Sequence, residues 1–254
     1  PNTFYLLDMR VSFIRAQYTH LYGPDLSRDY GSPLLETVLR ESLVRLNRGL
    51  PAEAIAEAIA KLRDFGGSSL LKKNMAFMEY LQNGVPVRYF VNGEDRNVIV
   101  YLIDHQNVDR NCFYAVNQFT YIENGNNRRP DIVLFVNSLP LVIIELKSPS
   151  KDEVGAENAF HQIRNYMQDI PGIFYYNALC VISDLSTNKA GTITSGFDRF
   201  MEWKTKDGNY ENPAYAQFVT FYEGIFQRER FLDILKNFIC FSVSQENTAK
   251  ILAG

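Results

Sequence analysis

Residues 128–147 read RRPDIVLFVNSLPLVIIELK. This stretch contains two apolar runs, Ile132–Val136 and Leu141–Ile144, separated by the turn-forming residues 137–140. Short apolar runs bounded by turn residues are typical of buried strands. The stretch therefore predicts a buried β-hairpin.

This hairpin brings three charged side chains to one end. If the turn centres on Ser138, Asp131 lies opposite Glu145 on the same face, with Cβ atoms about 4.5–5.5 Å apart. Lys147 follows two residues later and shares that face. Two adjacent carboxylates at a buried sheet end repel each other, and a divalent cation removes the conflict. Such ligands suit Mg²⁺, so the pattern predicts metal-assisted phosphodiester hydrolysis; the alternative is a structural salt bridge.

Two similar motifs elsewhere in the chain lack this setting. Pro24–Asp25 lies in a Gly-Pro-Asp loop, and the Glu-x-Lys motif of residues 202–204 precedes a polar turn. Neither motif lies on paired apolar strands, so we expect neither to belong to the site.

The segment after the hairpin is expected to form a helix. Apolar residues recur at helical spacing through residues 154–168, and Pro171–Gly172 ends the run. Gln162 and Tyr166 are four residues apart, so they lie on one face of this helix. They flank the apolar stripe and could face the carboxylates, although alone they also fit an ordinary amphipathic helix.

The remaining patterns predict a mixed α/β protein. Helices are expected near residues 34–47, 51–62, 70–81 and 230–239, and strands near 86–91, 97–103, 112–122, 178–183 and 192–194. Residues 4–22 are aromatic and ambiguous, with a helix as one interpretation. The order of these elements indicates a central mixed β-sheet flanked by helices.

Composition limits the class of protein. The 254 residues carry a net charge of −3, which argues against strong DNA binding by this piece alone. Cys112, Cys180 and Cys240 have apolar neighbours and are expected to be reduced core residues of a cytosolic protein. The sequence contains no zinc motif, no Gly-x-x-x-x-Gly-Lys-Ser/Thr loop for ATP and no apolar run long enough to span a membrane.

Asp131, the Glu145–Lys147 motif and the Gln162–Tyr166 motif resemble the PD-(D/E)xK nuclease superfamily, in its RecB-like branch with a Gln-x-x-x-Tyr motif. Further stretches resemble the N-terminal region of the restriction (R) subunit of type I restriction-modification enzymes. These are residues 43–48, 102–104, 116–119, 128–131, 135–141, 203–205 and 250–254.

The resemblance implies one endonuclease domain over residues 1–254, a fragment that precedes an ATP-driven translocase motor. It implies a helical part over about residues 1–84, a restriction-endonuclease-like core over about 85–200, and a C-terminal helix and linker over about 201–254. The implied activity is hydrolysis of the backbone of unmodified foreign double-stranded DNA in the prokaryotic cytoplasm. Modification and specificity subunits are the implied partners, and ATP would serve only the complete subunit.

The resemblance also implies residue roles. Asp131 and Glu145 would hold Mg²⁺, Lys147 would be the catalytic lysine, and Gln162 with Tyr166 would support the site or contact DNA. Superfamily members often supply another acid from an early helix; the candidates in this chain are Glu36 and Glu41, and the choice between them stays open.

Two other functions compete with this one. A non-catalytic docking or DNA-binding module with a nuclease-like fold would fit the acidic net charge and the many aromatic residues. A nuclease of another RecB-like lineage, such as a repair enzyme, would share the core motif but not the matches at residues 43–47 and around Trp203.

Overall fold

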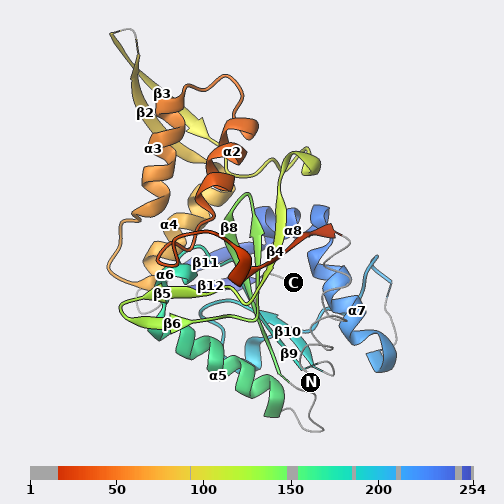
Figure 1. The fold of residues 1–254 in the computed structure, drawn as a ribbon. Helices are drawn as coiled ribbons and strands as arrows, with labels where there is room; N and C mark the ends of the chain where they lie inside the picture. The colour runs from red at the N-terminus through yellow and green to blue at the C-terminus, as the bar shows by residue number, and fades with distance from the viewer. Residues whose placement is uncertain are drawn as a thin grey trace.

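The structure is a computed structural model that describes residues 17–91, 93–147, 154–184, 187–209, 213–243 and 248–252. A mixed six-stranded sheet, in the order β1-β4-β7-β8-β9-β10, forms its centre (Figure 1). The pairs β1/β4 and β8/β9 are parallel, and the other neighbours are antiparallel. These strands are β1 (Thr19–Tyr22), β4 (Phe113–Asn117), β7 (Ile132–Val136), β8 (Leu139–Leu146), β9 (Leu179–Ser183) and β10 (Asn188–Gly191).

The predicted hairpin is the centre of this sheet. Every residue of β7, and every residue of β8 except Leu146, is buried, because helices cover both faces of these strands. At the open end Ile132 pairs with Ile144, which is the register that sets Asp131 opposite Glu145. The central hairpin and its predicted register are therefore confirmed.

The turn of the hairpin is tighter than predicted. Only Asn137 and Ser138 form it, both with positive φ (51° and 78°), and β8 begins at Leu139 rather than Leu141. Two central residues with positive φ match the twist of antiparallel strands. A register shift between Leu134 and Phe135 then restores the predicted pairing at the open end.

Asn137 anchors this turn to the rest of the fold. Its side-chain oxygen accepts from the Cys112 N–H (2.8 Å), and its amide nitrogen donates to the Leu102 carbonyl (2.9 Å) and to Asn111 Oδ1 (2.8 Å). The side chain is fully buried, so its loss leaves buried polar groups without partners.

We expect Asn137→Ala to lower the free energy of unfolding by about 3 kcal/mol, from lost buried hydrogen bonds and an unfavourable positive φ. Asn124→Ala is the matched control, because Asn124 has a φ of 50° in an exposed turn; it should lose only about 1 kcal/mol. Chemical denaturation measures both values. Equal losses in the two variants would show that the side-chain anchor contributes nothing.

Alternation along the central strands divides the core between two faces. Val133, Phe135 and Ile143 pack against α5 (Val154–Asp169) and α6 (Pro171–Phe174). Ile132 and Ile144 point to the opposite face and belong to the larger core. That core includes residues of α3 (Ala52–Arg63), α4 (Leu70–Asn83) and α8 (Arg228–Asp233). The result is a helix–sheet–helix arrangement, as predicted (Figure 1).

Most predicted elements are present with small shifts. The first predicted helix is α2 (Glu36–Leu46), the next two are α3 and α4, and the helix that carries Gln162 and Tyr166 is α5. The expected helix near 230–239 begins at Arg228 as α8 and continues as a π-helical turn, η4 (Ile234–Phe238). Apolar residues at helical spacing thus predicted these helices, but not the change from α-helix to π-helix after Asp233.

Three strand predictions were wrong in detail. The strand expected over 112–122 divides into β4 and β5 (Tyr121–Glu123), because Gln118 has a φ of 55° and interrupts the extended backbone. The strand expected at 192–194 lies at 188–191 instead. Thr192 begins a turn in which the Ser195 N–H donates to the Thr192 carbonyl, which ends the ladder. The strand expected over 97–103 is β3 (Glu94–Val100) and ends earlier.

Other features lay outside the predictions. Residues 19–22 form a strand of the central sheet, whereas residues 1–16 of the ambiguous N-terminal segment lie outside the described residues. Cys240 is exposed and Cys112 only half-buried, so the expectation of core cysteines is confirmed for Cys180 alone. The sequence patterns did not predict the small hairpin partner β6 (Asn126–Arg128), helix α7 (Pro213–Phe226) or the pair β11 (Ile239–Val243) and β12 (Thr248–Leu252).

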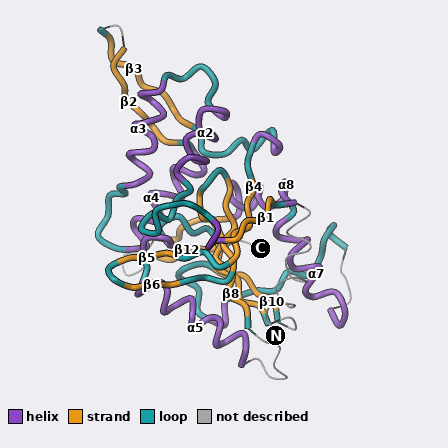
Figure 2. The backbone as a smooth tube through the Cα atoms, viewed as in Figure 1, coloured by secondary structure: helices purple, strands orange, loops and turns teal. Residues whose placement is uncertain are grey.

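The hairpin of β2 (Val85–Val91) and β3 is separate from the central sheet. It projects beyond the helices at one end of the molecule (Figure 2). Val85, Val87 and Val100 anchor its base in the larger core, whereas Phe90 near its tip is exposed. The expected nuclease core from residue 85 thus begins with an appendage, and the central sheet takes its β1 strand from the expected helical part.

Candidate active site

The site is built where several central strands end at the same edge of the sheet. β7 begins there directly after Asp131, and antiparallel β8 ends there at Glu145 and Leu146. β9 runs parallel to β8, and the Lys147 N–H donates to the Ser183 carbonyl at 2.9 Å. This topology brings the three predicted catalytic residues to one edge, on the face covered by α5.

Glu145 and Lys147 form a direct ion pair. Lys147 Nζ lies 3.0 Å from Glu145 Oε1. Glu145 is 3 % exposed, and its second oxygen, Oε2, is buried with no close hydrogen bond among the described residues, although the Tyr166 hydroxyl lies near enough to stabilise the charge of the carboxylate. Burial, reinforced by the nearby charge of Asp131, raises the pKa of Glu145 to about 7. The strands therefore hold the Glu145 carboxylate where its negative charge is unfavourable. A bound cation would offset this charge, so the position is typical of a metal ligand.

Asp131 is held by backbone and side-chain donors. Its Oδ2 accepts from the Leu146 N–H at 2.9 Å, and its Oδ1 accepts from Gln118 Nε2 at 3.1 Å. Gln118 lies in the family-like stretch 116–119, but no sequence pattern marks it as a site residue. Gln118 has a positive φ, which directs its side chain toward Asp131, and no sequence pattern predicts this conformation.

Gln162 and Tyr166 lie beside these carboxylates. Gln162 Nε2 donates to the Tyr166 hydroxyl oxygen at 2.9 Å, so the predicted pairing on one face of α5 is confirmed. Tyr166 is buried, and burial together with the charge of Glu145 raises the pKa of its hydroxyl above the usual range. Tyr166 is therefore a neutral hydroxyl whose oxygen already accepts from Gln162, which leaves its proton to point toward the carboxylate side.

The two candidate additional acids lie apart from this cluster. Glu36, at the start of α2, forms an exposed ion pair with Arg63. Glu41 acts electrostatically on Tyr114, which pairs with Phe135 four residues along β7 from the predicted catalytic aspartate, a strand distance of about 13 Å. Neither acid has a hydrogen bond or ion pair with the cluster among the described residues, so an extra acidic ligand stays a prediction.

Two arginines, Arg128 and Arg129, precede Asp131 in the chain. Arg128 pairs with Asp169 at the end of α5 (2.8 Å). Arg129, two residues before Asp131, is exposed. Arg128 is thus held in a structural ion pair, whereas the Arg129 side chain is exposed and close in the chain to Asp131.

The residues of the cluster fit Mg²⁺. No group of three or more His, Cys, Asp and Glu side chains suited to a metal occurs in the described part of the chain. Mg²⁺ needs fewer protein ligands, because it binds through one or two carboxylates and keeps several waters. Asp131 and Glu145 supply two carboxylates, and Glu145 Oε2, which makes no close hydrogen bond among the described residues, supplies a buried acceptor.

Comparison with known proteins identifies the family. A family model described as the N terminus of the type I restriction enzyme R protein matches residues 12–199. The chain belongs to this family. All five residues of the carboxylate, lysine and Gln-x-x-x-Tyr cluster fall inside the matched region.

Individual relatives agree with the family assignment. The type I restriction enzyme HindI endonuclease subunit of Haemophilus influenzae is 33 % identical over 236 residues, which cover 88 % of this chain and 22 % of that protein. The putative type I restriction enzyme MjaIXP endonuclease subunit of Methanocaldococcus jannaschii is 29 % identical over 248 residues, covering 87 % and 24 %. The chain thus spans about a quarter of the length of these relatives (22 % and 24 %).

Proposed function

We propose that this R-protein N-terminal region is the Mg²⁺-dependent DNA endonuclease domain of a type I restriction enzyme. The observation that carries the proposal is Glu145, paired with Lys147 at 3.0 Å, whose negative charge is destabilised by burial and, second, by the charge of Asp131. A purely structural salt bridge needs one acid, whereas this edge collects two. The names of the relatives, which are endonuclease subunits, support the same activity.

Each residue of the cluster then has a role. When bound, Mg²⁺ would activate water and stabilise negative charge on a phosphate. Asp131 and Glu145 would hold it through the oxygens that face the shared edge. Lys147, with a side chain 29 % exposed, is open enough to meet a DNA phosphate while still touching Glu145. Its ammonium would orient the attacking water and stabilise the charge that develops on the phosphate.

The Gln162–Tyr166 pair would orient the buried carboxylate. Tyr166 is buried beside Glu145, so it supports the site from within rather than reading DNA directly. Gln162, which is half-buried on the same face of α5, lies nearer the solvent and is the better placed of the two to reach DNA. The positions of these two residues support different tasks within one motif.

The proposal extends to the setting of the whole protein. Double-stranded DNA would be brought to this domain by an ATP-driven motor and by modification and specificity subunits in the prokaryotic cytoplasm. The net charge of −3 supports such dependence, because a free DNA-binding domain usually carries a basic surface. No helix in the described ranges is long and apolar enough to cross a lipid bilayer.

The test compares Asp131→Ala and Lys147→Ala with the wild type in the full-length subunit assembled with its partners. Both variants should cut DNA at least about a hundredfold more slowly, because each removes several kcal/mol of transition-state stabilisation. ATP hydrolysis should persist at the wild-type rate. Both activities are followed in one reaction with Mg²⁺.

Lys204→Ala is the matched control for the lysine. Lys204 ends the chain's second Glu-x-Lys motif, is exposed and lies off the sheet edge, so its loss should leave cleavage unchanged. If Asp131→Ala and Lys147→Ala cut DNA as fast as Lys204→Ala does, the cluster is structural. The docking-module interpretation would then replace the nuclease proposal.

A further inference from the structure

The carboxylate of Asp131 is fixed in direction before any cation arrives. Each of its oxygens accepts one hydrogen bond, Oδ2 from the Leu146 N–H (2.9 Å) and Oδ1 from Gln118 Nε2 (3.1 Å). A carboxylate has about four lone-pair positions, so each oxygen keeps one that is free for a metal. One donor comes from β8 and the other from the end of β4, so rotation of the carboxylate would break one of the two bonds.

We propose that Gln118 is a positioning residue that sets the direction in which Asp131 presents its free lone pairs to the metal; this inference rests on the proposed function. Gln118 holds Asp131 twice. Besides the side-chain bond, the Gln118 N–H donates to the Asp131 carbonyl at 2.8 Å. Its amide donates a hydrogen bond but carries no charge, so it orients the carboxylate without competing with a cation as a lysine or arginine would.

Gln118 adopts an unusual conformation to make these contacts. Its φ of 55° lies in the left-handed region, which residues other than glycine, asparagine and aspartate seldom adopt. Strained backbone of this kind clusters at functional sites and persists only where surrounding structure enforces it. With φ in the extended range, β4 would continue past Asn117, and the Gln118 side chain would be directed elsewhere.

The turn after β1 helps to hold Gln118 in this conformation. Gly23 begins η1 (Gly23–Asp25) and packs so closely on β4 that a Cβ there would lie 2.4 Å from the Gln118 carbonyl oxygen and 2.8 Å from that of Asn117. On the other side, Phe119 is fully buried against Phe135. Gln118 is thus clamped between a close backbone contact and an anchored aromatic ring, and both Asp131 contacts depend on that clamp.

Gln118→Gly separates positioning from folding. Glycine adopts positive φ readily, so the variant keeps the turn and loses only the side-chain donor. Asn124→Gly is the matched control, because it relieves the same kind of positive φ (50°) in the exposed β5–β6 turn and leaves Asp131 untouched. Both variants should unfold at or above the wild-type temperature.

The probe is Mn²⁺, titrated into the 254-residue chain and followed calorimetrically. Gln118→Gly should weaken Mn²⁺ binding about tenfold or more, the usual effect of removing a partner of a metal ligand, and Asn124→Gly should leave it unchanged. In the assembled full-length enzyme, Gln118→Gly should need correspondingly more Mg²⁺ for half-maximal cleavage and recover most of the rate at saturating Mg²⁺. A merely structural role would not produce recovery by metal.

The outcomes distinguish this inference from the proposed function. If the wild type binds Mn²⁺, Asp131→Ala does not, and Gln118→Gly binds like the wild type, Gln118 has no positioning role and the nuclease proposal stands. If the wild type binds no Mn²⁺ and Asp131→Ala cleaves DNA normally, both fail together. Weaker binding by Gln118→Gly alone, with restored cleavage at high Mg²⁺, establishes the role.

Discussion

Glu145→Gln will stabilise the metal-free protein at pH 8 by up to about 3 kcal/mol while reducing cleavage at least about a hundredfold. The stabilisation follows from the raised pKa of Glu145, about 7 against an ordinary value of 4.5. The unfolded chain releases this proton near pH 4.5, whereas the folded protein keeps it until about pH 7. Between these values the folded state binds more protons, so the stability of the wild type falls as the pH rises through this window.

Glutamine keeps the shape of the side chain without the charge. Its oxygen can still accept from Lys147, and the repulsion from Asp131 disappears. The stability of Glu145→Gln should therefore vary less between pH 5 and pH 7 than that of the wild type. Chemical denaturation across this range in EDTA measures the difference.

Mg²⁺ should reverse the order of stability. A ligand that binds only the folded state stabilises it in proportion to its affinity, and only the wild type keeps both carboxylates. Glu53→Gln, at an exposed acid in α3, controls for the loss of one negative charge and should change neither stability nor cleavage. Equal pH dependence in Glu145→Gln and the wild type would show that Glu145 is not destabilised in the folded protein.

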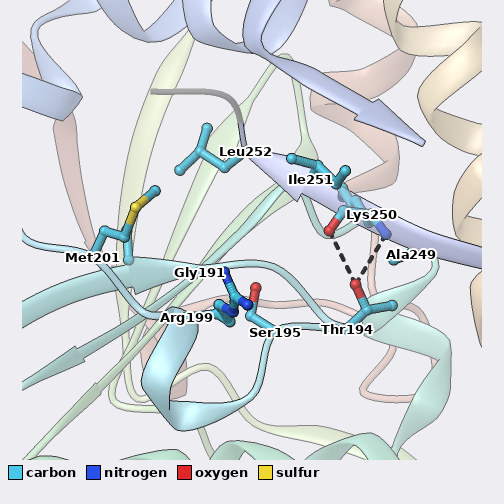
Figure 3. A pocket seen from close by; sticks show the side chains of 10 residues that line it. Gly191, Thr194, Ser195, Arg199, Met201, Ala249, Lys250, Ile251 and Leu252 are labelled. Carbon is cyan, nitrogen blue, oxygen red and sulfur yellow. Dashed lines mark hydrogen bonds between the residues drawn. The ribbon is translucent and has the colours of Figure 1, made fainter. Parts of the chain in front are cut away.

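The second large effect concerns Lys250, a buried lysine on β12. Its Nζ donates to the Asn177 carbonyl (2.6 Å) and to Asn74 Oδ1 (3.1 Å), and no carboxylate among the described residues pairs with it. Burial lowers the pKa of Lys250 to about 7. Its backbone is also fastened, because the Lys250 N–H donates to Thr194 Oγ1 (2.9 Å), whose own hydroxyl donates to the Lys250 carbonyl (Figure 3).

These contacts join the β11–β12 hairpin to the edge of the central sheet. They border a cavity of about 490 Å³ between β10 and β12, whose lining includes Gly191, Ser195 and Leu252 (Figure 3). This cavity is separate from the carboxylate cluster, since none of its lining residues belongs to the proposed site. The ionisation of Lys250 should therefore change the stability of the protein through the attachment of the β11–β12 hairpin, and should not change catalysis.

The stability of the wild type should rise by about 2 kcal/mol from pH 7 to pH 9 because of Lys250. A lysine with a lowered pKa loses its proton in the folded state near pH 7, but in the unfolded chain only near 10.5. The unfolded state thus binds more protons in this window, and stability increases with pH. The raised pKa of Cys180, about 12, acts in the opposite direction, but only above about pH 9, where unfolded thiols ionise.

Lys250→Met should remove this slope. The methionine side chain fills similar space but has no titrating group. The free energy of unfolding of the variant should therefore stay constant between pH 7 and pH 9, where that of the wild type rises. Lys72→Met, at an exposed lysine of α4, should keep the wild-type slope. Parallel curves for the wild type and Lys250→Met, measured by denaturation at pH 7, 8 and 9, would contradict the assignment.

Local sequence patterns were enough to predict the central hairpin, the register at its open end and the grouping of five polar residues beside it. The reason is local: alternating strand geometry fixes which residues of one hairpin share a face, and a four-residue interval fixes which residues of one helix do. Asp131, Glu145 and Lys147 lie on one hairpin, and Gln162 and Tyr166 on the next helix. Their grouping therefore needed little information from distant parts of the chain.

The surroundings of that cluster depend on contacts between distant parts of the chain. Gln118 reaches Asp131 because Gly23, far away in sequence, packs against its backbone. Lys250 is buried because β12 packs beside Asn74 and Asn177, which lie far from it in the sequence. Such contacts join residues that are tens to hundreds of positions apart, and no periodicity records them. Local sequence patterns thus predict which polar side chains lie together, whereas long-range packing determines which other residues hold them in position.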